Sequence, residues 1–122
     1  MIRVFVADAQ AEERSALRLT LIDLNMGVVG EASCWQATLA EASRTLVDIL
    51  LVDYDLLPAG SESALAKLHS VFPGAIVLLL INPLDARHQA TLSRGADAII
   101  SKGETPERVA ERLRAAANTI GQ

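Results

Sequence analysis

Three ionisable side chains, those of Asp8, Asp53 and Lys102, stand just beyond short apolar runs of the chain. Two carboxylates and one ammonium can hold a metal cation between the carboxylates or an anion against the lysine. Plainer explanations exist, because a lone aspartate at a strand end is often only solvated, and Asp8 could cap the following helix or pair with Lys102. The fold must decide whether the three residues meet.

Five apolar runs that do not alternate with polar residues predict strands buried on both faces. They are residues 4–7, 28–29, 49–52, 75–81 and 98–100. Segments with helical spacing separate them, so that a strand followed by a helix occurs five times. This pattern predicts a parallel sheet in which a helix crosses over after each strand.

Most of the helical segments carry their own start and stop signals. Gly27 is the expected stop of the first helix, and residues 33–36 give the second a capping-box start. The third spans roughly residues 61–72 and is the least clearly bounded. The fourth is expected at residues 82–95, with Asn-Pro at its start and Gly at its end, and Thr105 caps the fifth ahead of a proline.

Right-handed crossovers place such helices on both faces of the sheet, which makes a doubly wound α/β fold. Ligands of these folds bind at the carboxyl ends of the strands, where the strand order reverses. In a five-stranded parallel sheet of order 2-1-3-4-5, the ends carrying Asp8, Asp53 and Lys102 are neighbours. We therefore expect one domain over residues 1–122, with the three side chains converging at one edge.

Three stretches, taken in order, resemble the receiver (CheY-like) domain of two-component response regulators, and the NarL/LuxR-type branch fits best. They are Ile2 to Asp8, Asp48 to Asp53, and Gly95 to Glu107, the last including Lys102. The resemblance covers essentially the whole chain and implies the flavodoxin-like (βα)5 receiver fold.

The resemblance also implies roles for four residues. Asp53 corresponds to the aspartate that accepts a phosphoryl group from a kinase histidine, and Lys102 to the lysine that contacts the phosphate. Asp8 corresponds to an acid of the Mg²⁺ site, which would include Asp53 and the backbone carbonyl of Asp55. Positive charge from the metal and the lysine would let a carboxylate nucleophile approach an anionic phosphoryl group.

Four positions depart from the family pattern. The second acid of the family's pair is Ala9, and the hydroxyl residue that senses the phosphoryl group is Leu80. The aromatic switch residue of the fifth strand is Ile99, and Pro58 falls one residue later than usual after the acceptor. These changes make the chain an atypical receiver.

The missing acid predicts a weaker Mg²⁺ site. Asp8, Asp53 and Lys102 sum to a formal charge of −1, whereas three carboxylates and one lysine give −2. A unit charge about 4 Å away is worth roughly 4 kcal/mol at an effective dielectric near 20, so losing one weakens the metal site even after a large discount for solvent. The acids that could compensate by turning inward are Asp55, Glu12 and Glu13.

Composition limits the classes of partner. The net charge is −4 and only four residues are aromatic, so the sequence predicts no nucleic-acid surface on this domain. The longest apolar run, residues 75–81, is far shorter than the roughly 20 residues that span a bilayer. A single cysteine, Cys34, and a start that lacks a leader pattern favour a cytoplasmic protein with no membrane segment.

Two functions fit these observations. The first is a phosphorylation-controlled receiver that takes its phosphoryl group from a histidine kinase or another phosphodonor and signals to an output module, by resemblance a helix-turn-helix DNA-binding domain. The second is a pseudo-receiver that works without phosphate as a dimerisation or protein-interaction module, which Ala9, Leu80 and Ile99 favour. A cofactor enzyme of flavodoxin type is not expected, because no Gly-rich phosphate loop follows the first strand.

Overall fold

The computed structural model describes residues 1–59, 61–82 and 95–120. Its strands are β1 (Arg3–Ala7), β2 (Gly27–Ala32), β3 (Ile49–Asp53), β4 (Ile76–Ile81) and β5 (Ala98–Ser101). The described helices are α1 (Ala11–Asp23), α2 (Trp35–Glu41), α3 (Ser61–Val71) and α5 (Pro106–Asn118), with a short 3₁₀ helix, η1 (Tyr54–Leu56). The fourth helix expected from the sequence lies outside the described residues.

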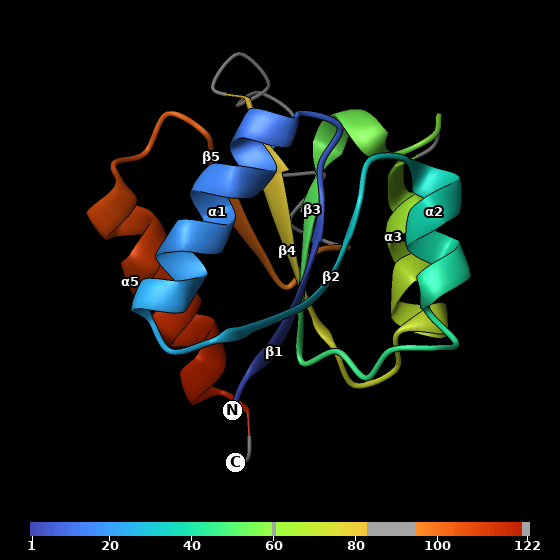
Figure 1. The fold of residues 1–122 in the computed structure, drawn as a ribbon. Helices are drawn as coiled ribbons and strands as arrows, with labels where there is room; N and C mark the ends of the chain where they lie inside the picture. Colours follow the sequence, from blue (N-terminus) through green and yellow to red (C-terminus); the bar gives the residue numbers. More distant parts are fainter. Residues whose placement is uncertain (60, 83–94, 121–122) are drawn as a thin grey trace.

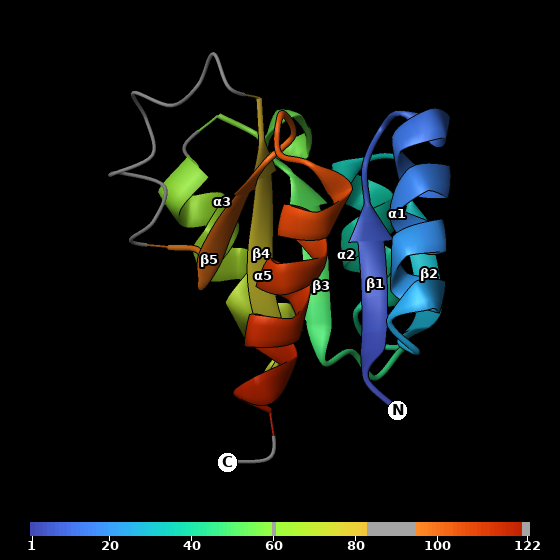
Figure 2. The ribbon, with the colours of Figure 1, turned by 90° about the vertical axis from the view of Figure 1, so that its left-hand side faces the viewer.

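The five strands form one parallel sheet of order β2-β1-β3-β4-β5, which confirms the predicted topology. Helices α1 and α5 cover one face, and α2 and α3 cover the other (Figure 1). Figure 2 views the sheet from the face that α1 and α5 cover. The carboxyl ends of the strands therefore lie along one edge of the sheet, at the top of Figure 1.

Two apolar cores, one on each face, hold these layers together. On one face Leu65 and Leu68 of α3 pack with sheet residues that include Phe5. On the other, Leu21 of α1 and Leu113 of α5 pack with a second set of sheet residues. All four residues of the run Ile49 to Val52 are fully buried, because successive residues of the strand supply opposite cores.

One predicted helix stop and one predicted helix cap were wrong. Helix α1 ends at Asp23, and the left-handed residue beyond it is Asn25, with φ of 58°, whereas Gly27 begins β2. Asn is among the few residues with a side chain that tolerate this conformation, so a glycine is not needed there. Helix α2 has Cys34 as its N-cap, whose Sγ accepts from the Ala37 N–H at 3.4 Å, so the capping box expected over residues 33–36 does not form.

Two other boundaries agree with the sequence. Thr105 caps α5, its Oγ1 accepting from the Arg108 N–H at 3.3 Å, and Pro106 is the first helical residue. Helix α3 ends at Val71, one residue before the predicted end. No helix among the described residues is long and apolar enough to cross a bilayer.

Candidate functional site

Three strand ends position the residues that the sequence singled out. Asp8 follows β1, and its backbone N–H donates to the carbonyl of Ala32 at 3.0 Å. Asp53 is the last residue of β3, where it pairs with Leu80. Lys102 follows β5, and its N–H donates to the Ile81 carbonyl at 2.8 Å. The sheet ladder itself thus carries all three residues to one edge.

The Lys102 ammonium is hydrogen-bonded to the Asp53 carboxylate. Nζ of Lys102 donates to Oδ2 of Asp53, and the Asp53 side chain is only 4% exposed. The other oxygen, Oδ1, accepts from the backbone N–H of Asp55 at 2.8 Å, which caps η1. Both carboxylate oxygens are therefore held, one by a main-chain group and one by a positive charge.

A fourth charged side chain, that of Glu13, enters the site from the first turn of α1. Its Oε2 lies 3.0 Å from Nζ of Lys102. One carboxylate oxygen each from Asp8, Glu13 and Asp53 lie within 4.8 Å of one another. The sequence had offered Glu13 only as one of three acids that could compensate for Ala9. A sharper signal was available, because Glu13 stands four residues before Leu17, which packs against the core of that face.

Glu13 corrects the charge count made from the sequence. The four ionisable groups have a formal charge of −2 when all are charged, and not −1. The site therefore holds as many carboxylates as the full family pattern, although one comes from a helix instead of the loop after β1. Ala9, the expected gap, is exposed.

The close carboxylates perturb one another. Burial, and next the neighbouring Glu13 carboxylate, raise the pKa of Asp8 to about 7. The pKa of Glu13 is lowered by Asp8 and by the Lys102 ammonium. Burial alone would lower the pKa of Lys102, but its bonds to Asp53 and Glu13 outweigh that and raise it. Without a metal, Asp8 is therefore protonated in a large fraction of molecules near neutral pH, whereas the lowered pKa of Glu13 keeps that side chain ionised.

These residues suit a hard divalent cation. Asp8 is fully buried, and its Oδ2 has no hydrogen-bond partner within the part of the chain that the structure describes. An ionised carboxylate in that position needs a proton or a cation to satisfy it. Carboxylate oxygens are the ligands that Mg²⁺ prefers, so the three acids form a group that could bind this metal.

The positions that depart from the family pattern lie around the site. Leu80 is 4% exposed and lines a cavity of about 170 Å³ between α1, β4, β5 and α5. Asp8, Glu13 and Lys102 line the same cavity. Ile99 is half-buried and packs against the core of the opposite face. Asp55 is exposed within η1, and Pro58 is exposed just beyond it.

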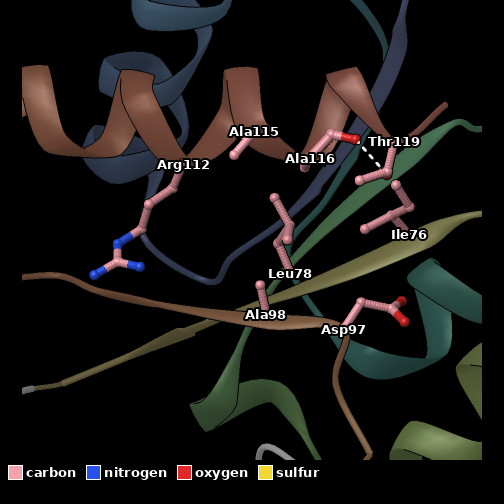
Figure 3. A pocket seen from close by; sticks show the side chains of 8 residues that line it. All are labelled: Ile76, Leu78, Asp97, Ala98, Arg112, Ala115, Ala116 and Thr119. Atoms are coloured by element: carbon pink, nitrogen blue, oxygen red, sulfur yellow. Dashed lines mark hydrogen bonds between the residues drawn. The ribbon is translucent and has the colours of Figure 1, made fainter.

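A larger hollow, of about 390 Å³, lies between β4, β5 and α5 and contains none of the three carboxylates (Figure 3). Ile76, Leu78 and Ala98 line it from the strands, together with Asp97, and residues of α5 that include Arg112 and Ala116 line it from the helix. Asp97 precedes β5 whereas Lys102 follows it, so this hollow lies toward the other end of that strand. We assign it no part in the chemistry of the site.

A response regulator is similar to the chain in sequence. No model of a protein family matches the chain. The response regulator UvrY of Escherichia coli strain K12 is 31% identical over 119 residues, which cover 93% of this chain and 53% of UvrY. The chain thus spans about half the length of the curated relatives it matches.

Two solved structures with the same fold are of response regulators. The receiver domain of AraT from Geobacillus stearothermophilus is 22% identical, with a TM-score of 0.84, covering 98% of this chain and 95% of that one. RcsB from Salmonella enterica serovar Typhimurium, bound to the promoter rprA in the presence of the phosphomimetic BeF₃⁻, is 19% identical. Its TM-score is also 0.84, and the match covers 98% of this chain and 63% of that one. The chain is thus similar in sequence to about half of a response regulator, and its fold is that of solved receiver domains.

Proposed function

We propose that this receiver domain accepts a phosphoryl group on Asp53 and passes its state to an output module. The observation that carries the proposal is the bond between the Lys102 ammonium and the Asp53 carboxylate, at the same strand ends as Asp8 and Glu13. A carboxylate beside a fixed positive charge and a group of metal-binding acids is suited to phosphoryl transfer.

In the proposed reaction, an oxygen of Asp53 attacks the phosphorus of a phosphodonor. The bond from phosphorus to the donor's leaving atom breaks, and the leaving group takes a proton. Asp53 Oδ1 is already held by the Asp55 N–H, so Oδ2 is the oxygen that becomes the nucleophile once Lys102 releases it. The Lys102 ammonium then contacts a phosphoryl oxygen, which replaces its bond to the carboxylate with a bond to a more negative group.

Asp8, Asp53 and the backbone carbonyl of Asp55 are the ligands that the family resemblance proposes for Mg²⁺. The bound ion would neutralise charge on the phosphoryl oxygens. The unpartnered oxygen of Asp8 supports its place in this set.

The proposal extends to partners. UvrY is about twice the length of this chain, and RcsB binds promoter DNA. We infer that the domain works in the cytoplasm with a helix-turn-helix DNA-binding output domain, and that a histidine kinase or a small phosphodonor supplies the phosphoryl group. A homodimer is part of this proposal, whereas direct contact of the domain with DNA is not, since its net charge is −4.

Chemical trapping tests the acceptor residue. The protein is incubated with acetyl phosphate and Mg²⁺ and then reduced with borohydride, which converts an acyl phosphate to an alcohol. Peptide mapping should locate the new alcohol at position 53 alone. Modification at Asp8 or Asp55 instead, with Asp53 unchanged, would contradict the assignment.

A phosphate-independent interaction module is the second candidate. The observation that favours it is Leu80, a buried aliphatic residue that pairs with Asp53 where a hydroxyl would sense the phosphoryl group. A ligand shifts an equilibrium only through contacts that differ between two states. If Asp53 accepts a phosphoryl group but the binding of the domain to its partners stays the same, this second function is the better description.

A further inference from the structure

The loop after β1 cannot supply the usual second metal ligand, because position 9 is an alanine. An alanine side chain has no oxygen, so a Mg²⁺ site here would have only Asp8 and Asp53 as anionic ligands unless another element contributes. Mg²⁺ is bound mainly through carboxylates and water, so the number of carboxylates largely sets its affinity.

Glu13 is the described acid whose geometry meets this need. A carboxylate oxygen of Glu13 lies within 4.8 Å of ligand oxygens of both Asp8 and Asp53. Glu12, its neighbour on the same helical turn, is exposed. Successive residues of an α-helix differ by about 100° in direction, so only one of two adjacent glutamates can face the sheet edge.

Two observations besides the cluster itself point to a cation. The first is the buried Oδ2 of Asp8, which no described donor satisfies. The second is Lys102, whose ammonium already lies against two of the three carboxylates, 3.0 Å from Glu13 and bonded to Asp53. The protein's own positive charge thus occupies part of the position that a metal would take.

We propose that Glu13, from the first turn of α1, supplies the third carboxylate of the metal site in place of the acid missing at position 9. The inference rests on the proposed function, since it concerns the same site. It makes the metal site depend on how α1 packs, because the ligand is carried by the helix and not by the loop after β1. On metal binding, Glu13 exchanges its contact with Lys102 for one with the ion, and Lys102 keeps its bond to Asp53.

Metal titration of matched variants tests this proposal. Binding of Mg²⁺ is measured by calorimetry, and binding of Mn²⁺ by electron paramagnetic resonance of the free ion. Glu13→Gln should weaken both by about tenfold or more, since a unit charge this close is worth several kcal/mol before screening. Glu12→Gln removes the same charge from the same turn and should change affinity by less than about twofold, because exposed charges are screened. Far-ultraviolet circular dichroism verifies that each variant is folded.

A rescue variant separates ligation from general charge. Ala9→Asp added to Glu13→Gln restores a third carboxylate from the loop and should return the affinity toward that of the parent. Equal weakening by Glu12→Gln and Glu13→Gln would overturn the proposal, as would an unchanged affinity in Glu13→Gln or a parent that binds neither metal.

Phosphorylation of Asp53, followed by intact mass, keeps the two claims apart. If the parent binds Mg²⁺ through Glu13 but gains no phosphoryl group, the proposed function fails and the ligand assignment stands. If the parent is phosphorylated while Glu13→Gln binds Mg²⁺ as tightly, the assignment fails and the function stands.

Discussion

At the residue scale, the site is a balance of buried charges. Asp8 and Asp53 are almost fully buried, and Lys102 is the described cation that contacts Asp53. Ionising all the buried carboxylates at once is unfavourable when no metal is bound. This is why the pKa of Asp8 is raised to about 7. Without a cation, these close carboxylates therefore lower the stability of the fold.

Asp8→Asn should make the metal-free protein more stable at neutral and alkaline pH. A carboxyl whose pKa rises from 3.8 to about 7 on folding stabilises the fold fully below pH 3.8, and this contribution is lost as the pH rises through 7. Asparagine is neutral throughout and keeps an oxygen for the Gln10 N–H, which now donates to Asp8 Oδ1 at 2.9 Å.

We expect the gain to be roughly 1 to 4 kcal/mol at pH 8, from about 1.4 kcal/mol per pKa unit, and near zero at pH 4. Urea unfolding in the presence of EDTA at the two pH values measures it. A variant that is less stable than the parent at pH 8 would show that the ionised Asp8 stabilises the fold.

At the element scale, a single N-cap residue can stabilise the first turn of a helix. The Thr105 side chain accepts from the Arg108 N–H and begins α5, whose Leu113 is fully buried in one of the two cores. Lys102 lies in the loop between β5 and this helix.

Thr105→Ala should lower the free energy of unfolding by about 1 kcal/mol, because it leaves one main-chain N–H of the first turn without its acceptor. Thr105→Ser retains the hydroxyl and should remain close to the parent. Guanidinium unfolding of the three proteins measures the difference, and equal losses in both variants would show that the methyl group and not the cap matters.

Strands were easier to predict from the sequence than helix boundaries. The run from Ile49 to Val52 is wholly apolar because both faces of a central parallel strand are buried. A short run of this kind therefore predicts a buried strand. Helix ends depend on finer geometry. The left-handed residue after α1 could be Asn25 or Gly27 from residue type alone, and Cys34 is a weak cap that sequence patterns do not favour.

Some residues of the site could likewise be predicted from the sequence, and one was not. Asp8, Asp53 and Lys102 could be found because strand order fixes which strand ends are neighbours. Glu13 could not be selected over Glu12 on residue type, because they are adjacent and chemically identical. The feature that distinguishes them is spacing, because Glu13 and not Glu12 lies four residues before Leu17, which packs against one core.

At the scale of the whole molecule, Arg3 and Asp48 fasten β1 to the loop before β3, at the end of the sheet opposite the site. Asp48 accepts from the Arg3 backbone N–H at 2.8 Å and from its guanidinium at 3.1 Å. The Arg3 guanidinium holds the pKa of Asp48 below its usual value of 3.8.

Asp48→Asn should lower the urea midpoint at pH 7, since the lowered pKa shows that the fold favours the ionised form. A depressed pKa contributes stability above the unfolded value of 3.8 that is lost as the pH falls through the folded value. The difference between the two proteins should therefore be equal at pH 7 and pH 5 and shrink below pH 3.8. If the stability difference between the parent and Asp48→Asn already shrinks between pH 7 and pH 5, a group other than Asp48 is responsible for it.

Phosphorylation should change the shape of the molecule only slightly. Leu80 offers no hydroxyl to a phosphoryl oxygen, and Ile99 packs against a core with no ring to swing outward. Any dimer should then persist without phosphate, supported by exposed aliphatic residues of α1 such as Leu19 and Ile22.

Sedimentation of untreated protein, of Asp53→Asn and of protein treated with beryllofluoride should give the same oligomeric state. A monomer that dimerises only with beryllofluoride, and only when Asp53 is present, would restore a full phosphate switch.

We propose above all that Asp53 accepts a phosphoryl group at a site that also contains Lys102, Asp8 and Glu13. Intact mass spectrometry after incubation with acetyl phosphate tests it most directly, with Mg²⁺ or with EDTA, on the parent and on Asp53→Asn. We expect the mass of one added phosphoryl group in the parent with Mg²⁺, and none with EDTA or in the variant. An unmodified parent in Mg²⁺, or equal modification of Asp53→Asn, would contradict it.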